Sequence, residues 1–309
     1  MTTFNIITAD VIDGLASLPD ESVNCVVTSP PYWGLRDYGT GVWIDGDAGC
    51  DHLGKPMAMG QFCTRCGAIR IDKQLGLEAT PEEYTAKMVE VFREVRRVLK
   101  KDGTLWLNLG DSYASDPTKG YGSPDGKNKN AGSQRARYIG DGIKPKDRMG
   151  IPWLVAFALR TDGWWLRSDI IWSKPNPKPE SVKDRPTRAH EYVFLLTREP
   201  TYFYDSDSIM EQGKEKKRNR RSVWTIPISY FTGAHFAVFP EQLVALCVKA
   251  GCPSNGIVLD PFSGSGTTGL VASMLGMNYI GIELNPEYAE MSRNRIAEGM
   301  GLFVEDVSE

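Results

Sequence analysis

A glycine-rich string near the C-terminal end constrains the fold more than any other feature of this sequence. Residues 260–269 read Asp-Pro-Phe-Ser-Gly-Ser-Gly-Thr-Thr-Gly, follow the strand-like run 256–259 and precede a helical pattern. The three glycines fit the spacing G-x-G-x-x-G, and Glu283 ends the next apolar run, 279–282. A tight turn between strand and helix, with an acidic residue at the next strand end, is typical of a nucleoside site on a Rossmann-like βαβ unit.

A second string lies near the N-terminus, where residues 28–33 read Thr-Ser-Pro-Pro-Tyr-Trp after an apolar run. Proline has no N–H and fixes its own φ, so Ser29 and Pro30 present oxygen atoms on a stiff, extended stretch. Such a stretch can accept hydrogen bonds from an amino group. Tyr32 or Trp33 beside it could stack on a planar ring.

The two strings, in this order, resemble those of the amino-methylating DNA methyltransferases. Members of this family transfer a methyl group from S-adenosylmethionine to the exocyclic nitrogen of cytosine or adenine. Their SPPY motif surrounds the target amine, and an FxGxG motif, here residues 262–266, forms the cofactor loop. Because the SPPY string comes first, the chain resembles the circularly permuted β group of the family, and the resemblance covers nearly the whole chain.

The resemblance implies an α/β fold, a Rossmann-like S-adenosylmethionine-dependent methyltransferase with circularly permuted motifs. We expect residues 1–309 to form a single catalytic domain around a mostly parallel twisted sheet with helices on both faces. The alternation of strand-like and helical patterns favours the same architecture. Expected strands cover residues 4–8, 23–27, 105–109, 164–172, 192–197, 256–259 and 279–282, and expected helices cover 81–102, 152–160, 241–249 and a segment from 286 onward.

The methyl group of a sulfonium is already activated, so the site has mainly to align it with a weakly nucleophilic amine. Hydrogen bonds from the amine to the Ser29 hydroxyl and the Pro30 carbonyl would localise the nitrogen lone pair toward the methyl group. Tyr32 would lie against the face of the base, which must be flipped out of a duplex to reach this pocket. The expected catalytic residues are Ser29, Pro30, Pro31 and Tyr32; core packing is the alternative for Tyr32 and Trp33.

The glycine loop and its surroundings are the expected cofactor site. Gly264 and Gly266 would let the backbone approach the methionine part, and Glu283 would accept the ribose hydroxyls. The resemblance places Asp10 near the adenine amino group, although a helix N-cap explains this residue equally well. The expected cofactor-binding set is Asp10, Thr28, Asp260, Pro261, Phe262, Gly264, Gly266, Thr267, Thr268 and Glu283, with Asp260 organising the loop.

A cysteine and histidine cluster interrupts the chain in the segment 42–72. Its spacing is Cys50-x-His52-x10-Cys63-x2-Cys66. Tetrahedral zinc takes thiolate and imidazole ligands from two closely spaced pairs, and intracellular proteins rarely hold disulfides. We therefore expect 42–72 to be a zinc-binding insertion with a structural ion; a disulfide or plain buried thiols are the alternatives.

The net charge of −3 conceals three basic segments. Residues 117–149 contain eight lysines and arginines against three acids, residues 174–188 five against two, and residues 214–221 six against one. Concentrated positive charge in loops is the electrostatic footprint that DNA phosphates require, although a charge run is often only a solvated surface. We expect loops at 114–148 and 205–235 to contact double-stranded DNA and to recognise the target.

No apolar run approaches 18 residues, and the N-terminal residues do not resemble a signal peptide. We therefore expect a cytoplasmic protein that does not enter a membrane. Pairing is frequent in the β group, which makes a homodimer a possible assembly.

Three other functions compete with DNA methylation. RNA and protein-glutamine methyltransferases use related Asn/Asp-Pro-Pro-Tyr strings, but they resemble the unpermuted order. A nicotinamide dehydrogenase would explain only the glycine loop, and a non-catalytic zinc DNA-binding module would leave both intact motifs unexplained. Among DNA methyltransferases, Ser29 stands where adenine-N6 enzymes mostly carry Asp. We therefore favour the N4 amine of cytosine as the target, with adenine-N6 as the alternative.

Overall fold

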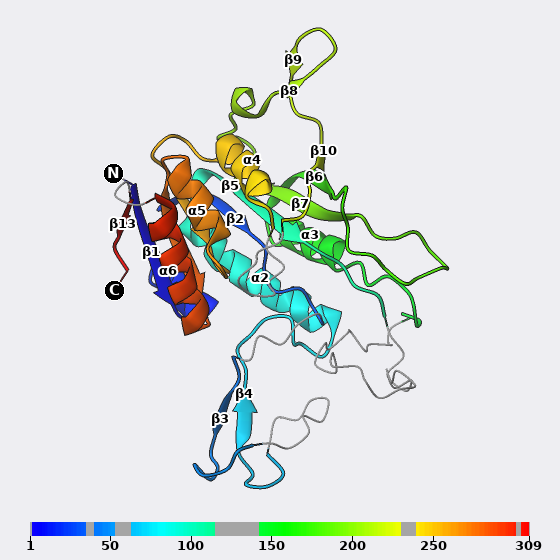
Figure 1. Cartoon of the computed structure of the whole chain (residues 1–309), viewed down its shortest axis with the longest axis vertical. Helices are drawn as coiled ribbons and strands as arrows, with labels where there is room; N and C mark the ends of the chain where they lie inside the picture. Colours follow the sequence, from blue (N-terminus) through cyan, green and yellow to red (C-terminus); the bar gives the residue numbers. More distant parts are fainter. Residues whose placement is uncertain are drawn as a thin grey trace.

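The structure is a computed structural model that describes residues 2–34, 40–52, 63–114, 142–229, 239–300 and 304–308. A nine-stranded sheet with the order β10-β6-β7-β5-β2-β11-β12-β1-β13 forms the centre of the described chain (Figure 1). Its strands are β1 (Thr2–Thr8), β2 (Val23–Thr28), β5 (Leu99–Leu109), β6 (Trp165–Ser173), β7 (His190–Thr197), β10 (Val223–Thr225), β11 (Ile257–Asp260), β12 (Asn278–Glu283) and β13 (Val304–Asp306).

All neighbouring strands pair in parallel except β7, which is antiparallel to both β5 and β6. The expected mostly parallel sheet is therefore confirmed. The carboxyl ends of β2, β11, β12 and β1 share one edge of the sheet, and the reversed direction of β7 brings its amino end to that edge as well. His190, the first residue of β7, pairs with Ser173, the last residue of β6.

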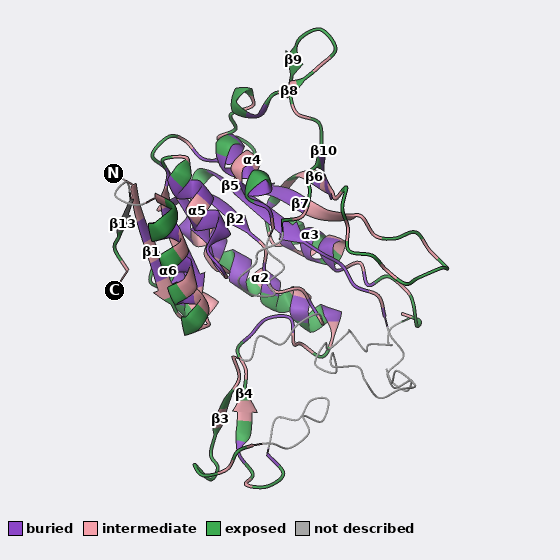
Figure 2. Cartoon of the chain, in the orientation of Figure 1, coloured by how far each residue is buried: buried purple, intermediate pink, exposed green. Residues whose placement is uncertain are grey.

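Helices cover both faces of the sheet, as expected. One face packs against α1 (Val11–Ala16), α2 (Pro81–Val98) and α3 (Ile151–Thr161), and the other packs against α4 (Glu241–Gly251), α5 (Thr267–Met274) and α6 (Pro286–Met300). Strand β2 lies between the two cores, and every one of its residues is buried (Figure 2). Val26 joins the core under α2, whereas Cys25 and Val27 join the core under α4.

Helix α2 begins as its sequence indicates but ends earlier than expected. The Thr80 hydroxyl accepts a hydrogen bond from the Glu83 N–H at 3.1 Å, and Pro81 occupies the first turn, where its missing N–H has no cost. The helical periodicity predicted an end near Gly103, but the helix stops at Val98. Leu99 is already extended and pairs with Val23 of β2, so strand pairing ends the helix and lengthens β5.

Two small hairpins project from opposite ends of the molecule in the view of Figure 1. One is formed by β3 (Val42–Ile44) and β4 (Ile69–Ile71), and the other by β8 (Glu211–Gln212) and β9 (Lys217–Arg218), which follows the short 3-10 helix η1 (Asp207–Ile209). The first lies in the expected insertion 42–72 and the second in the expected recognition segment 205–235.

Parts of the expected segments lie outside the described residues: 53–62 of the insertion, 115–141 of the loop 114–148, and 230–235 of the recognition segment. Among the described helices, none combines the length and the apolar character needed to cross a membrane.

Candidate active site

The SPPY string follows β2 directly, at the edge of the sheet where the parallel strands end. Ser29 and Pro31 line a cleft, and Pro30 between them is buried. The Pro31 carbonyl accepts a hydrogen bond from the Tyr84 hydroxyl of α2 at 3.0 Å, which fixes the extended stretch to the buried face of this helix. Trp33 is 3% exposed and donates its ring N–H to the Glu78 carbonyl. Core packing, the alternative that the sequence left open, therefore describes Trp33.

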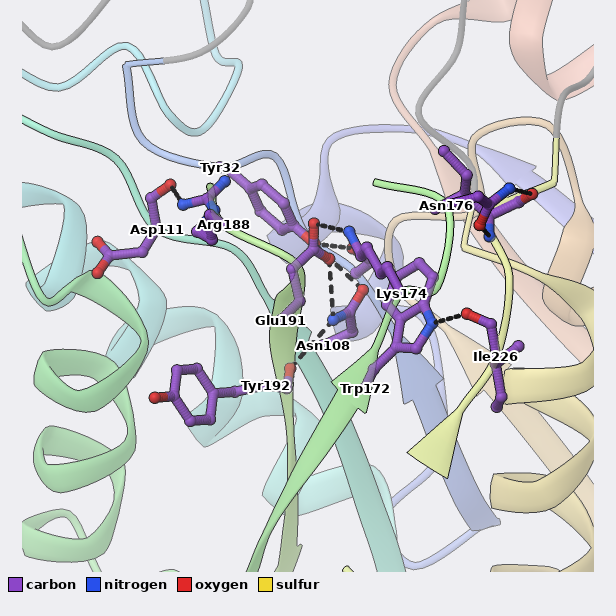
Figure 3. Close-up of polar contacts among 12 residues, drawn as sticks. Tyr32, Asn108, Asp111, Trp172, Lys174, Asn176, Arg188, Glu191, Tyr192 and Ile226 are labelled. Atoms are coloured by element: carbon purple, nitrogen blue, oxygen red, sulfur yellow. Dashed lines mark hydrogen bonds and ion pairs between the residues drawn. The ribbon is translucent and has the colours of Figure 1, made fainter. Parts of the chain in front are cut away.

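Tyr32 is absent from the lining of the cleft, and its side chain points toward Asn108 and Glu191, in a polar cluster where β2, β5 and β7 meet (Figure 3). Its hydroxyl lies 3.2 Å from the Ser29 Oγ, 3.1 Å from the Asn108 Oδ1 and 3.0 Å from the Glu191 Oε2. Its ring packs closely on Gly110, where an added Cβ would come within 2.4 Å of it. Burial, and then the neighbouring Glu191 carboxylate, raise the pKa of Tyr32 well above its ordinary value, so this hydroxyl stays protonated.

The other side of this cluster consists of residues outside the expected catalytic set. The Lys174 ammonium forms an ion pair with the Glu191 Oε1 and lies 4.1 Å from the ring centroid of Trp172. The Asn108 side-chain amide donates to the Tyr192 carbonyl at 3.0 Å and to the Glu191 Oε2 at 3.4 Å. Asn108 gives no motif signal, and it meets Glu191 only because β5 and β7 are neighbours.

Asp260, at the end of β11, organises the glycine loop as expected. One carboxylate oxygen accepts from the Thr28 hydroxyl at 2.7 Å and from the Phe262 N–H at 3.0 Å, and the other accepts from the Thr268 hydroxyl at 2.7 Å. Burial raises the pKa of this carboxyl from 3.8 to about 6, while the three donors act in the opposite direction. Thr28 thereby links the SPPY string of β2 to the glycine loop of β11.

Glu283 closes the other side of the loop. Its Oε2 accepts the Gly264 N–H at 2.8 Å and its Oε1 accepts the Asn285 N–H at 2.9 Å. Burial raises the pKa of this carboxyl above its ordinary value. Gly264 and Gly266 both have a positive φ, at 52° and 76°, which glycine adopts without strain.

The cleft encloses ≈ 1050 Å³ including its open mouth, and residues from both halves of the chain line it. Eight of the ten expected cofactor residues do so: Asp10, Asp260, Pro261, Phe262, Gly264, Thr267, Thr268 and Glu283. Thr28 and Gly266 lie outside the lining; Gly266 instead lets α5 approach α6, since an added Cβ would lie 2.4 Å from the Ser292 Oγ. Asp10 lines the cleft and also caps α1, accepting the Ile12 N–H at 3.1 Å, so the N-cap interpretation is confirmed, and contact with the adenine stays a prediction.

The four expected metal ligands converge in the connection between β3 and β4, at the end of the hairpin away from residues 41 and 72. Ligand atoms of Cys50, His52, Cys63 and Cys66 all lie within 4.8 Å of one another. The Cys50 and Cys63 sulfurs are 3.8 Å apart, and the Cys66 sulfur is 3.6 Å from the His52 Nδ1. The three cysteines are free thiols. Hydrogen bonds from His52 and then from backbone N–H groups lower the pKa of Cys63 to about 6.

The His52 ring stacks on Trp43 of β3 with a centroid distance of 4.7 Å, which fixes its orientation toward the sulfurs. The chain leaves the hairpin through Lys73, Gln74 and Leu75, which line the cleft. Residues 67–72, which include β4, therefore connect the cysteine and histidine cluster to the wall of the cleft.

Comparisons with known proteins agree with this geometry. A family model described as DNA methylase, covering N6 and N4 methyltransferases, matches residues 23–294. The type II methyltransferase M.SmaI of Serratia marcescens is 47% identical over 294 residues, which span 94% of this chain and 90% of that protein.

Solved structures share the fold. The PvuII DNA methyltransferase (cytosine-N4-specific) matches with a TM-score of 0.65 and 20% identity over 96% of this chain and 86% of that chain. A putative DNA modification methylase from Thermus thermophilus, TTHA0409, complexed with S-adenosyl-L-methionine, matches with a TM-score of 0.61 and 22% identity over 99% of this chain and 98% of that chain. The family match and the identity to the type II enzyme show that the chain belongs to the DNA methylase family of amino (N6 or N4) DNA methyltransferases.

Proposed function

We propose that this protein transfers a methyl group from S-adenosylmethionine to the exocyclic N4 amine of cytosine in double-stranded DNA. One observation carries the proposal: Ser29 and Pro31 line the same cleft as the glycine loop and Glu283. A methyl donor on the loop and an amine on the SPPY string would therefore face each other within one cavity. Thr28, through its hydrogen bond to Asp260, holds the two motifs in fixed relation.

The residues of the cleft fit S-adenosylmethionine. Glu283 accepts one backbone N–H on each oxygen, and a carboxylate has further lone pairs for two ribose hydroxyls. Asp10 and Phe262 would border the adenine, and the backbone of the loop would approach the methionine part. When bound, the sulfonium supplies an activated methyl group, and the protein contributes alignment.

Ser29, Pro30 and Pro31 are proposed to hold the target amine, and Tyr32 to hold Ser29. The Ser29 Oγ contacts the Tyr32 hydroxyl and belongs to a residue that lines the cleft, so an N–H of the base could donate to it from the open side. Tyr32 itself faces the cluster around Glu191, which favours a hydrogen-bonding role for its hydroxyl beside the expected contact with the base. A base reaches this depth only when it leaves the duplex.

Cytosine is favoured over adenine on two grounds. A serine hydroxyl stands at position 29, where the resemblance associates adenine enzymes mostly with a carboxylate, and the PvuII enzyme that shares the fold is cytosine-N4-specific. The relatives that are type II methyltransferases support a site-specific reaction. The basic segments 174–188 and 214–221 are proposed to contact the DNA backbone, with the β8–β9 hairpin in the recognition segment.

A structural zinc ion is proposed for the cluster of Cys50, His52, Cys63 and Cys66. Tetrahedral coordination with Zn–S bonds of about 2.3 Å places two sulfurs about 3.8 Å apart, and a sulfur and an imidazole nitrogen about 3.5 Å apart. The distances in the cluster, 3.8 Å and 3.6 Å, fit both values. With four protein ligands no position is left for substrate, so the ion would stabilise the hairpin.

Nucleoside analysis tests the proposed reaction. Unmodified DNA is incubated with the protein and S-adenosylmethionine carrying a deuterated methyl group, digested to nucleosides and analysed by mass spectrometry. We expect deuterated 4-methylcytosine. Deuterated 6-methyladenine alone would move the target to adenine while keeping the family's chemistry, and label found only in RNA or in protein substrates would refute DNA methylation.

A further inference from the structure

The polar cluster behind Ser29 imposes a direction on its hydrogen bonds. A hydroxyl carries a single hydrogen, so Ser29 can accept from a substrate amine only while its own hydrogen points elsewhere. The Tyr32 hydroxyl, 3.2 Å away, is the acceptor on that side. Tyr32 must then direct its own hydrogen onward, either to the Asn108 Oδ1 at 3.1 Å or to the Glu191 Oε2 at 3.0 Å.

The charge of Glu191 decides between these two acceptors. A hydrogen bond to an ionised carboxylate is roughly twice as strong as one to a neutral amide oxygen. The Asn108 amide group donates to the same carboxylate oxygen and to the Tyr192 carbonyl, so it steadies the acceptor. The hydrogen bonds therefore run from Ser29 through Tyr32 to Glu191, and Figure 3 shows the last two of these residues facing each other.

Glu191 is a partly buried carboxylate that is paired with a lysine. Its side chain is 13% exposed and that of its partner Lys174 is 15% exposed. It stands second in β7, and the antiparallel direction of that strand brings it to the edge of the sheet where Ser29 lies. Nothing in the binding of a methyl donor requires a carboxylate at this place, because Glu191 does not line the cleft.

We propose that Ser29, Tyr32 and Glu191 form a proton relay that removes the proton lost by the target amine, with Glu191 as the terminal acceptor and Lys174 as the residue that positions it. The inference rests on the proposed function, because it takes Ser29 as the contact of the amine. Glu191 is a positioning and proton-accepting residue that acts through Tyr32 without touching the base.

With this relay, every electron pair and every proton of the methyl transfer is accounted for. The amine lone pair forms the new N–CH₃ bond, and the electron pair of the broken S–CH₃ bond stays on sulfur. The methylated nitrogen then gives one proton to the Ser29 oxygen as Ser29 gives its own to Tyr32 and Tyr32 gives its own to Glu191. The carboxylate ends protonated, the two hydroxyls are restored, and the proton later passes to water.

The test uses the full-length protein, unmodified duplex DNA and labelled S-adenosylmethionine under single-turnover conditions. Glu191→Gln keeps the shape and removes the proton acceptor, and Tyr32→Phe cuts the relay one step earlier. We expect each to lower the transfer rate by about 10²-fold or more, the usual contribution of a general base. Both substitutions interrupt the same series of proton transfers. The double variant should therefore be no more than about threefold slower than the slower single variant.

Two further variants separate this role from a structural one. Glu191→Asp keeps the negative charge that Lys174 needs but withdraws the carboxylate from Tyr32, and we expect a folded protein with an intermediate rate. Glu94→Gln, which removes a carboxylate paired with Arg97 on α2, is the matched control and should retain the wild-type rate. Calorimetric affinity for S-adenosylmethionine should stay within about threefold of wild type in all variants, because Glu191 and Tyr32 lie outside the cleft lining.

An NMR measurement on the protein alone, without DNA or S-adenosylmethionine, tests the contact between Tyr32 and Glu191. In protein labelled with ¹³Cζ-tyrosine, the Tyr32 resonance is identified by its loss in Tyr32→Phe, and it should titrate at lower pH in Glu191→Gln because a neighbouring negative charge is gone. Independent, multiplicative rate losses in the double variant, or a Glu191→Gln rate within about threefold of wild type, overturn the relay. A wild-type protein that methylates no DNA refutes the proposed function instead.

Discussion

Asp260 makes the stability of the cofactor loop depend on pH in a direction opposite to that of most aspartates. Its carboxyl is 1% exposed, and burial raises its pKa from 3.8 to about 6. Because the folded pKa is the higher one, the folded protein holds this proton more tightly than the unfolded chain. The stabilisation is therefore complete below about pH 3.8 and is lost as the pH rises through about 6.

The magnitude follows from the two pKa values. One pKa unit corresponds to about 1.4 kcal/mol, so ionisation of Asp260 costs the folded state about 3 kcal/mol at pH 8 relative to acid conditions. About half of this, roughly 1.4 kcal/mol, falls between pH 5 and pH 8, where the protein can be handled.

Asp260→Asn removes the charge and keeps most of the hydrogen bonds. The amide oxygen can still accept from Thr28 and from the Phe262 N–H, while the new amide N–H group faces Thr268. The Thr268 hydroxyl also has the Val27 carbonyl at 3.3 Å as an acceptor, so it can turn its hydrogen away and accept from the amide. The variant should therefore fold without the ionisation cost.

The assay is urea unfolding of wild type and Asp260→Asn at pH 5 and pH 8, with Asp13→Asn, which alters an exposed aspartate of α1, as the control for net charge. We expect the stability of Asp260→Asn relative to wild type to increase by about 1.4 kcal/mol from pH 5 to pH 8. If the difference in unfolding free energy between the two proteins is equal at both pH values, the pKa of Asp260 is not raised. A wild type whose stability increases relative to the variant as the pH rises would contradict the raised pKa as well.

Three further outcomes are expected. Glu283→Ala should weaken S-adenosylmethionine binding by about 1–3 kcal/mol, as measured by calorimetry, since it leaves the ribose hydroxyls and the Gly264 N–H without their acceptor; unchanged affinity would remove Glu283 from the site. Purified protein should contain about one zinc per chain by elemental analysis, and Cys63→Ser should lose it, while zinc-free protein from zinc-supplemented cells would exclude the metal site. Gly266→Ala should lower the stability by about 1–3 kcal/mol in thermal unfolding because its Cβ would meet Ser292 and because φ is positive; a melting temperature equal to wild type would contradict the close packing of α5 on α6.

The features that could be predicted from the sequence are those marked by short motifs next to apolar runs. The SPPY string, the glycine loop and Glu283 each follow an apolar run directly, and parallel strands bring their carboxyl ends to one edge of a sheet. The expected convergence of Ser29 with the loop in one cleft required only this rule. The convergence of the four proposed metal ligands could be predicted as well, because their spacing brings two short pairs together whatever the surrounding fold.

Pairing between strands that are distant in the sequence explains which features could not be predicted from it. The antiparallel strand β7 sits between β5 and β6, yet 16 residues separate it from β6, too many to carry a hairpin turn signal. Glu191 and Asn108 are 83 positions apart and meet only through this pairing, so neither stood out as a partner of Tyr32. The short strands β3 and β4 pair with each other over three residues, too few to show a readable alternation in the sequence.

Both motifs are proposed to serve one amino-methylation site for DNA. The most direct measurement is sequencing, with detection of modified bases, of unmodified genomic DNA that has been treated with the protein and S-adenosylmethionine, with Ser29→Ala treated in parallel. We expect 4-methylcytosine at a single sequence context, and no signal from Ser29→Ala. Unmodified DNA after treatment with a protein that binds S-adenosylmethionine, or methylation of a ring carbon as 5-methylcytosine, would contradict this proposal.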